Sequence, residues 1–281
     1  MTQQALAAEF RRLHSPGAHR PLVLANAWDA MSARLVETAG ASAIATTSAG
    51  VSWALGHPDG HGLSRDAMIG AVSRIVQAVR VPVTADVESG YGAGTPEDVA
   101  ETVTRVIEAG AVGVNLEDSP GHNGGKLVDL SYQAARFAAA RAAASAAGVN
   151  VFINARIDTY LANVGDDAEA RFQETVRRAT AYMTAGADCI FVPMVTDAAL
   201  IERFGSSINA PLNVLAGPGA PTIAALRALG VARVSVGTWL ARSVIAQIQR
   251  AATEVLGTGT YDTLAGLTTS QDVNALFAAR P

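Results

Sequence analysis

The chain has 281 residues, of which 49% are hydrophobic and 16% are charged. This composition predicts a globular protein with a sizeable core and excludes a disordered chain. The formal net charge of -4, without a long basic run, argues against nucleic acid as a partner.

In chain order, residues 1–17 come first and lack the apolar core of a signal peptide. No apolar run reaches the roughly 18 residues of a membrane span, so we expect no membrane partner and a cytoplasmic location. Short apolar runs then alternate with Ala-rich helical stretches to the end of the chain. Eight runs are predicted strands, beginning at Pro21, Ser42, Val81, Gly113, Val151, Cys189, Pro211 and Arg233. Their continuous hydrophobicity is typical of strands covered on both faces.

Helical patterns separate these strands. Thr95 is the expected N-cap of one helix, with Pro96 at its first position and Gly110 at its end, and another helix is expected to start at Ser64. Eight strand–helix units in about 240 residues predict a (β/α)8 barrel, the TIM-barrel fold. The alternative is an open doubly wound sheet, because the glycine loop SGYGAGTPED lies between a strand and a helix. Thr95 stands where the dinucleotide fingerprint needs its last glycine.

Two further helical patterns follow the eighth strand, within about residues 238–281. They exceed what barrel closure needs. We therefore predict a single barrel domain over residues 1–281 with a C-terminal helical extension. The extension is expected to pack on a neighbouring subunit, with a helix exchanged between subunits, in a homodimer or homotetramer. The alternative is an extension that folds back on its own barrel.

Polar side chains gather at the predicted C-terminal ends of the strands, where barrels carry their chemistry. Asp86 and Glu88 alternate by two and share a face, and Glu117 ends the next strand. Such a cluster of carboxylates needs a cation or protons. Oxygen-only ligands favour Mg²⁺, with Mn²⁺ as an alternative. The competing interpretation is that Asp86 and Glu88 are solvated loop acids and that Asp118 caps the following helix.

Further candidates face the same mouth. Arg156 presents a fork that suits a carboxylate or phosphate, although it could instead form a structural salt bridge to Glu117 or Asp158. A small anion-binding loop is expected at Ser48, Ala49 and Gly50. Trp28 and Asn213 are candidate substrate contacts after the first strand and at the end of the seventh. A metal, an arginine and this loop together predict a site for a short dicarboxylate or a 2-oxo acid, where a metal could stabilise an enolate.

The segments ADVESGYG, GVNLEDS, FINARIDTY and WALGHPDG resemble the isocitrate lyase/phosphoenolpyruvate mutase superfamily, over nearly the whole chain. The resemblance implies a (β/α)8 barrel, Mg²⁺, enolate chemistry on 2-oxo acids, and dimers of dimers that exchange a terminal helix. By position, it implies metal binding, directly or through water, by a set of acids: Asp59 in the outer sphere, with Asp86, Glu88 and Glu117. It also implies that Arg156 binds the substrate carboxylate, that Ser48 and Ala49 hold the oxo-acid end, and that Asn213 binds a distal carboxylate.

The loop after Glu117 and Asp118 departs from the family pattern. Lyases of the superfamily carry Lys-Lys-Cys-Gly-His or Lys-Arg-Cys-Gly-His there, and the Cys is the acid/base. Here SPGHNGGKLV follows Asp118, so Gly121, His122 and Lys126 match the end of that loop while the Cys and the preceding Lys pair are missing. The Lys and Asn-Ser of the mutases are absent too. His122 is the predicted substitute acid/base, because an imidazole titrates near neutral pH; the alternative is a surface histidine.

Other candidates carry less weight. His57 and His61 have the spacing of a metal-ligand pair, but the glycines beside them favour a turn. The single cysteine, Cys189, is expected in the core, and it excludes a disulfide within the chain.

Three functions remain. The leading hypothesis is a Mg²⁺-dependent enzyme that cleaves a C–C bond next to a 2-oxo acid, as a lyase or a decarboxylase. The second is a mutase or hydrolase of phosphonate P–C bonds. The third is a 2-oxo acid binding protein that has lost catalysis, which the short loop suggests.

Overall fold

The computed structural model describes residues 1–15, 21–60, 62–119 and 126–278. Within these residues, eight parallel strands form one sheet in the order β1-β8-β7-β6-β5-β4-β3-β2. A parallel bridge between Ala27 and Thr46 joins the two edges and closes the sheet. The strands are β1 Leu22–Leu24, β2 Ile44–Ala45, β3 Val83–Asp86, β4 Gly113–Glu117, β5 Phe152–Arg156, β6 Cys189–Val192, β7 Leu212–Leu215 and β8 Arg233–Ser235. The predicted (β/α)8 barrel is confirmed, and the open doubly wound sheet is excluded.

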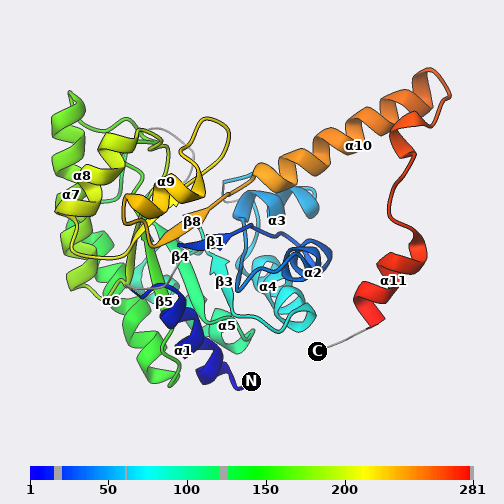
Figure 1. Cartoon of the computed structure of the whole chain (residues 1–281). Helices are drawn as coiled ribbons and strands as arrows, with labels where there is room; N and C mark the ends of the chain where they lie inside the picture. The colour runs from blue at the N-terminus through cyan, green and yellow to red at the C-terminus, as the bar shows by residue number, and fades with distance from the viewer. Residues whose placement is uncertain (16–20, 61, 120–125, 279–281) are drawn as a thin grey trace.

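Helices connect the strands and surround the barrel (Figure 1). They are α1 Gln3–Leu13, α2 Ala30–Thr38, α3 Ser48–Ala54, α4 Arg65–Ala78, α5 Pro96–Glu108, α6 Leu130–Ala146, α7 Ala168–Thr184, α8 Ala198–Ser207 and α9 Ile223–Ala228. The predicted caps are confirmed: the side chain of Thr95 accepts a hydrogen bond from Asp98 N, and that of Ser64 accepts one from Ala67 N. Such caps satisfy amide groups that the first helical turn leaves free.

The N-terminal helix covers the end of the barrel opposite the predicted site. Phe10 and His14 of α1 pack on Phe152 at the start of β5, with the His14 ring stacked 3.9 Å from the Phe152 ring. Burial lowers the pKa of His14 to about 3, with the charge of Arg233 as a smaller cause. His14 is therefore neutral at physiological pH and serves as a packing residue.

The interior of the barrel is unusually polar, since such barrels are commonly filled with bulky branched side chains. Asn154 Nδ2 donates to Asn115 Oδ1 at 2.7 Å, and Asn115 Nδ2 donates to Asp86 Oδ1 at 3.0 Å. Ser235 Oγ donates to Asn213 Oδ1 at 3.2 Å on the other side. These bonds run between neighbouring strands, so a ladder of polar side chains leads down from the mouth.

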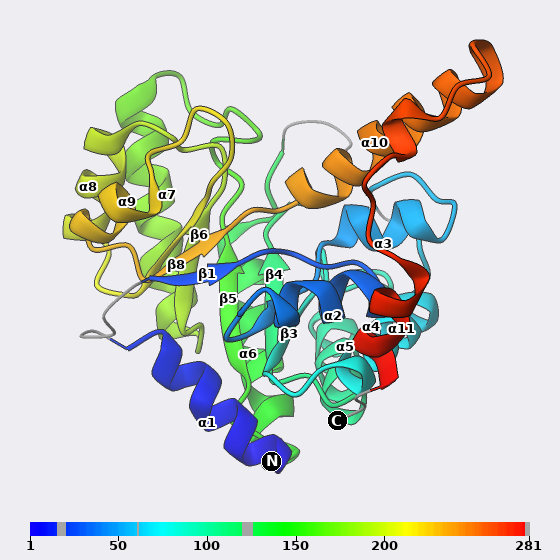
Figure 2. The same cartoon turned by 45° about the vertical axis from the view of Figure 1, so that its right-hand side comes forward.

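After β8 the chain leaves the barrel. Helix α10 (Trp239–Gly257) extends outward, and after the short helix η1 (Asp262–Leu264) helix α11 (Ser270–Ala278) returns to lie beside α2 (Figures 1 and 2). Arg34 Nε of α2 donates to Leu276 O at 2.9 Å. The two predicted helices are confirmed. The exchange of a helix between subunits and the single-domain assignment stay predictions. None of the helices in the described ranges combines the length and apolar character that crossing a membrane requires.

Substitution of Gly90 tests how closely the loop after β3 packs against α5. Its φ is +102°, and a Cβ there would lie 2.5 Å from Val99 Cγ2 of α5. Gly40 is a matched control, because its φ is +98° and nothing lies within 4 Å of its Cβ position. Both Ala variants carry the cost of left-handed backbone, about 1–2 kcal/mol. We expect Gly90→Ala to lose about 1–3 kcal/mol more, from overpacking. Urea unfolding measures both, and equal losses would contradict the contact with Val99.

Candidate active site

A cavity of about 380 Å³ opens at the C-terminal ends of the strands. Its wall includes five of the residues predicted from sequence: Ser48, Ala49, Asp59, Asp86 and Arg156. Ser48 and Ala49 begin α3 directly after β2, while Asp86 and Arg156 end β3 and β5. The βα topology therefore brings together groups that are up to about a hundred residues apart in the chain, as expected for this fold.

Asp86 is held by neighbours on both sides. Its Oδ2 accepts from Ser48 N at 3.0 Å, and its Oδ1 accepts from Asn115 Nδ2 at 3.0 Å. Its own N–H donates to Thr46 Oγ1 at 2.7 Å. Two donors, Ser48 N at the start of α3 and Asn115 Nδ2 on β4, thus hold this carboxylate at the end of β3, so its interpretation as a solvated loop acid is wrong.

Glu88 is buried as well, and Tyr91 OH donates to its Oε1 at 2.9 Å. Glu88 and Tyr91 both have positive φ angles, 50° and 60°. Residues other than glycine adopt this conformation only when their surroundings impose it, which is common near functional sites. The turn after β3 therefore points Glu88 inward under local strain, and it too is not a solvated acid.

Buried Glu117 forms an ion pair with the partly buried Arg156. Arg156 Nη1 lies 2.8 Å from Glu117 Oε2, and Arg156 Nε donates to Asp158 Oδ1 at 2.7 Å. The predicted structural salt bridges are thus present, and Arg156 still lines the cavity. The contacts of Arg156 within the described residues use its Nε and Nη1, which leaves Nη2 available to a ligand.

The charges in this region do not balance. Burial raises the pKa of Glu117 to about 8; Arg156 opposes the shift, while Asp158, Asp86 and Glu88 add to it. These carboxylates lie around the guanidinium of Arg156. Burial lowers the pKa of Arg156, but the negative charges of Glu117 and Asp158 outweigh burial and raise it. An all-oxygen set with excess negative charge fits a hard divalent cation.

The three carboxylates predicted to hold the metal point to different protein partners. Within the described ranges, no three His, Cys, Asp or Glu side chains converge in a metal-binding arrangement. Asp86 is turned to Asn115, Glu88 to Tyr91 and Glu117 to Arg156. Mg²⁺ keeps several waters and needs few direct protein ligands, so the residues fit Mg²⁺ held by Asp86 with the other acids acting through water.

Several predicted contacts lie behind the cavity wall. A Cβ on Gly50 would lie 2.8 Å from both Trp28 Cβ and Thr47 Cγ2, so Gly50 allows close packing against the half-buried Trp28. Asn213 lies within β7, which continues to Leu215, and its side chain is buried beneath the mouth. The prediction that the seventh strand ends at Asn213 was wrong, because the strand runs further before its loop.

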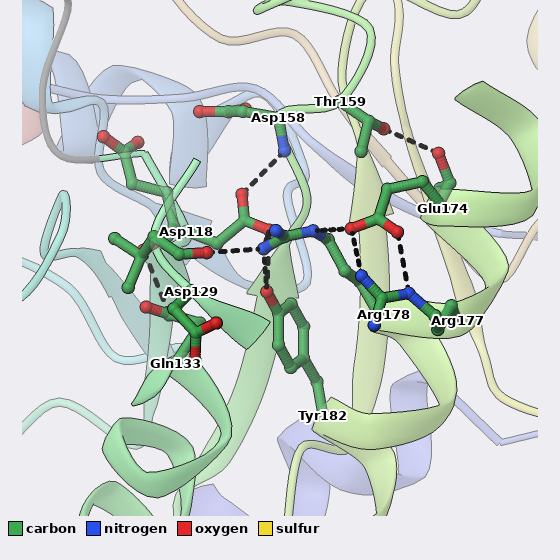
Figure 3. A network of polar contacts seen from close by, with 12 residues as sticks. Asp118, Asp129, Gln133, Asp158, Thr159, Glu174, Arg177, Arg178 and Tyr182 are labelled. Carbon is green, nitrogen blue, oxygen red and sulfur yellow. Dashed lines mark hydrogen bonds and ion pairs between the residues drawn. The ribbon is translucent and has the colours of Figure 1, made fainter. Parts of the chain in front are cut away.

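Asp118, which directly follows β4, is held by a network of polar contacts with the end of β5 and with α7 (Figure 3). Its carboxylate accepts from Asp158 N at 2.9 Å, from Arg178 Nη1 at 3.1 Å and from Tyr182 OH at 2.8 Å. Its carbonyl accepts from Val128 N at 2.9 Å, and Val128 O accepts from Arg178 Nη1 at 3.0 Å.

Asp118 thus ties the ends of β4 and β5 to α7 and to Val128, which precedes α6. The prediction that it caps the next helix was wrong, because Asp129 caps α6. Gly121, His122 and His61 lie outside the described residues, so the roles assigned to them stay predictions.

The site contains other residues that were not predicted from the sequence. Asn115 and Arg233 line the cavity, and Tyr91 contacts Glu88. One signal was available: a residue two positions before an inward-facing residue of a strand faces inward too. Asn115 precedes Glu117 in this way, and Arg233 precedes Ser235.

The fold and the acidic mouth define a (β/α)8 barrel protein whose cavity carries carboxylates beside a guanidinium. The family model for phosphoenolpyruvate phosphomutase matches residues 10–256, and the chain belongs to this family. The predicted enzyme of the isocitrate lyase/phosphoenolpyruvate mutase superfamily is therefore confirmed.

Relatives span several activities. An uncharacterised protein of Mycobacterium tuberculosis H37Rv is 40% identical over 229 residues, 82% of this chain and 81% of that protein. The 2-methylisocitrate lyase of Escherichia coli K12 is 31% identical over 215 residues, 71% of this chain and 69% of that protein. Oxaloacetate decarboxylase 2 of Pseudomonas fluorescens Pf0-1 is 28% identical over 189 residues, 65% of this chain and 60% of that protein.

Solved structures share the whole architecture. A protein from Burkholderia cenocepacia J2315, provisionally assigned as a lyase or mutase, has a TM-score of 0.90 and 39% identity, covering 99% of this chain and 98% of its own. A phosphonopyruvate hydrolase in complex with oxalate and Mg²⁺ has a TM-score of 0.84 and 26% identity, covering 98% and 95%.

The raised pKa of Glu117 predicts that binding of Mg²⁺ at this site would depend on pH. In the folded protein without metal, burial raises the pKa of Glu117 to about 8, so below that pH a growing share of its carboxyl is protonated and only hydrogen-bonded to Arg156, whereas the unfolded chain ionises near the ordinary value of 4.5. The folded state binds more protons in this window, so stability should fall as pH rises through it. Mg²⁺ favours the ionised carboxylate, so its affinity should rise by up to about tenfold per pH unit from pH 6 to 8.

Calorimetric Mg²⁺ titrations in two buffers of different ionisation enthalpy would show the released proton. Glu117→Gln should remove the pH dependence, while Glu108→Gln, on the exposed face of α5, should keep it. A wild-type affinity that stays constant over this range would contradict the role given to Glu117.

Proposed function

We propose that the protein is a Mg²⁺-dependent enzyme that acts on a 2-oxo acid or small dicarboxylate through an enolate, by C–C bond cleavage or decarboxylation. One observation carries the proposal: Arg156, braced by Glu117 and Asp158, lines the same cavity as Asp86. A fixed guanidinium suits a carboxylate, and a fixed acid suits a cation beside it.

Each side chain has a distinct task in this proposal. Arg156 holds the substrate carboxylate, and its two ion pairs limit the rotation of its fork. Asp86 orients the cation and is itself oriented by Ser48 N and Asn115. Glu88, Glu117 and Asp59 add negative charge or water-mediated contacts. A bound Mg²⁺ would polarise the 2-oxo group and stabilise the negative charge that develops on its oxygen.

The short loop after Asp118 favours decarboxylation over isocitrate-type cleavage. Loss of CO₂ leaves an enolate that solvent can protonate, whereas lyase turnover depends more on a positioned acid/base. Similarity to oxaloacetate decarboxylase 2 supports this preference. His122 is the acid/base that we propose for any assisted protonation. Phosphonate chemistry is the second candidate; the similarity to phosphonopyruvate hydrolase supports it, while the missing Lys and Asn-Ser of the mutases weigh against it.

We also propose that the protein works in the cytoplasm as a homodimer or homotetramer joined through its C-terminal extension. Helix α10 projects from the barrel with apolar side chains in solvent, among them Ile248 and Leu256, which are 62% and 86% exposed. Clustered exposed apolar groups of this kind are typical of association surfaces.

Arg156→Lys tests ligand binding. Lysine cannot reproduce the bidentate fork, so we expect affinity for oxalate or a 2-oxo acid in Mg²⁺ to fall by about 1.5–3 kcal/mol. Asp86→Ala should abolish the Mg²⁺ requirement together with tight binding. Arg203→Lys, which changes an exposed ion pair with Glu169, is the matched control and should bind as the wild type does. Calorimetry with and without Mg²⁺ gives these affinities.

A turnover panel then separates the candidate functions. We expect higher turnover of oxaloacetate-like acids than of isocitrate or 2-methylisocitrate, because general acid/base catalysis supplies about 10²–10⁴-fold. Phosphate released from phosphonopyruvate would favour the second candidate, and tight binding without turnover would identify a binding protein. Efficient isocitrate cleavage, or metal-independent binding, would overturn the leading proposal.

Ile248→Asp tests the proposed association. A charge buried in an apolar interface is strongly unfavourable, so the molar mass measured by light scattering should fall toward that of one chain at micromolar concentration. Gln249→Asp adds the same charge to the neighbouring exposed position of α10 and should leave the mass unchanged. A wild-type protein that is monomeric, or an Ile248→Asp variant that keeps its mass, would argue against association through this face.

A further inference from the structure

The turn that follows β3 brings the side chain of Tyr91 back onto Glu88. Glu88, Gly90 and Tyr91 have φ angles of 50°, 102° and 60°, so three of four successive residues adopt left-handed backbone. Gly90 N donates to Val87 O at 2.9 Å and closes the turn. The Tyr91 hydroxyl, three residues after Glu88, then donates to Glu88 Oε1 at 2.9 Å. Left-handed backbone is costly for the two residues that carry a Cβ, so their surroundings must hold the turn in place.

Helix α5 and strand β4 hold this turn. Thr102 Oγ1 of α5 donates to Gly90 O at 2.6 Å. Glu117 N of β4 donates to Glu88 O at 2.9 Å, so the backbone of Glu88 is tied to that of the next acid of the site. The Tyr91 ring packs in the core and is 5% exposed. The hydroxyl that contacts Glu88 is therefore presented from a rigid support.

The Tyr91 hydroxyl lies among the acids of the site. The negative charges of Glu88, Asp86 and Glu117 all act on it. A tyrosine side chain is neutral at physiological pH, so it can orient Glu88 without cancelling the negative charge that a cation would meet. Glu117 has a different kind of partner, because its charge is paired with that of Arg156. A neutral donor thus fixes one carboxylate of the group and leaves its charge to a ligand.

We propose that Tyr91 is a positioning residue for the divalent cation: its hydroxyl holds Glu88 in the orientation in which that carboxylate acts on Mg²⁺ through water. The inference rests on the proposed function, which places Mg²⁺ at Asp86. Groups that hydrogen-bond to metal-binding carboxylates restrict how these can turn. Tyr91 is not among the residues that line the cavity, so it would act on the cation only through Glu88.

Tyr91→Phe tests the proposal, because it removes the hydroxyl and keeps the ring. We expect Mg²⁺ affinity, measured by calorimetry, to fall about 10- to 100-fold, the usual effect of losing such a partner. The physical reason is that Glu88 must then be ordered at the moment when the cation binds. Mn²⁺ affinity, followed through the electron paramagnetic resonance signal of the free ion, should fall in the same proportion.

Tyr182→Phe is the matched control. Tyr182 is buried on α7, and its OH donates to Asp118 Oδ2 at 2.8 Å, so this variant also takes a hydroxyl away from a buried carboxylate. Asp118 does not line the cavity. Tyr182→Phe should therefore lower the urea midpoint as Tyr91→Phe does and keep the Mg²⁺ affinity of the wild type. Equal losses of Mg²⁺ affinity in the two variants would trace the effect to general destabilisation and overturn the proposal.

A double-mutant cycle with Glu88→Gln tests whether Tyr91 acts through Glu88. If it does, Tyr91→Phe should cost no further Mg²⁺ affinity once residue 88 is neutral. Additive losses, or a gain of affinity in Tyr91→Phe alone, would refute the positioning role. Should Tyr91→Phe not fold, Glu88→Gln still decides the question, because wild-type affinity in that variant would exclude Glu88 and with it the role of Tyr91.

Two outcomes distinguish this inference from the proposed function. If Mg²⁺ binding requires Asp86 but is unchanged in Tyr91→Phe, Tyr91 only supports the fold and the proposed function stands. If the wild type binds no Mg²⁺, with or without oxalate, the proposed function fails and this inference fails with it.

Discussion

The structure of the site depends on a surplus of negative charge around one guanidinium. Arg156 is buried between Glu117 and Asp158, while Asp86 and Glu88 act on the same group of charges from the neighbouring strand. Burial makes each ionised carboxylate expensive, and Arg156, which pairs with Glu117 and Asp158, forms no ion pair with Asp86 or Glu88 among the described residues. Protons, or a bound cation, would relieve this surplus. This single constraint links the stability of the barrel mouth to the divalent metal that we propose for it.

The surrounding scaffold keeps this unfavourable arrangement in place. Asp118 is next to Glu117, yet it points away from the cavity into a complete set of partners on β5 and α7. Two adjacent acids in the sequence thus have opposite roles, one facing the site and one securing the ends of the strands. The reason is the alternation of side chains along a strand, which sends neighbours to opposite faces.

Polar side chains also line the barrel interior below the mouth. Asparagines on β4, β5 and β7 carry hydrogen bonds from the mouth toward Arg233, in place of the apolar layers that usually fill such barrels. Polar interiors cost stability unless every group is satisfied. Among the described residues, buried atoms without a hydrogen-bond partner occur on several of these strands, including Asn154 Oδ1 on β5, Asn213 Nδ2 on β7 and Arg233 Nη1 on β8.

The sequence by itself determined the barrel, because strand hydrophobicity, the caps at Ser64 and Thr95 and the helix ends are local properties that survive in the fold. It also placed Asp86, Glu117 and Arg156 at one mouth, since parallel strands in a closed barrel all end on one side. Only the tertiary structure decided the partners: Glu88 with Tyr91, Asp118 with Arg178, and Arg233 with no acid in the part of the chain that the structure describes. Those pairings depend on side chains that meet across the barrel, where distance along the chain carries no information about contact.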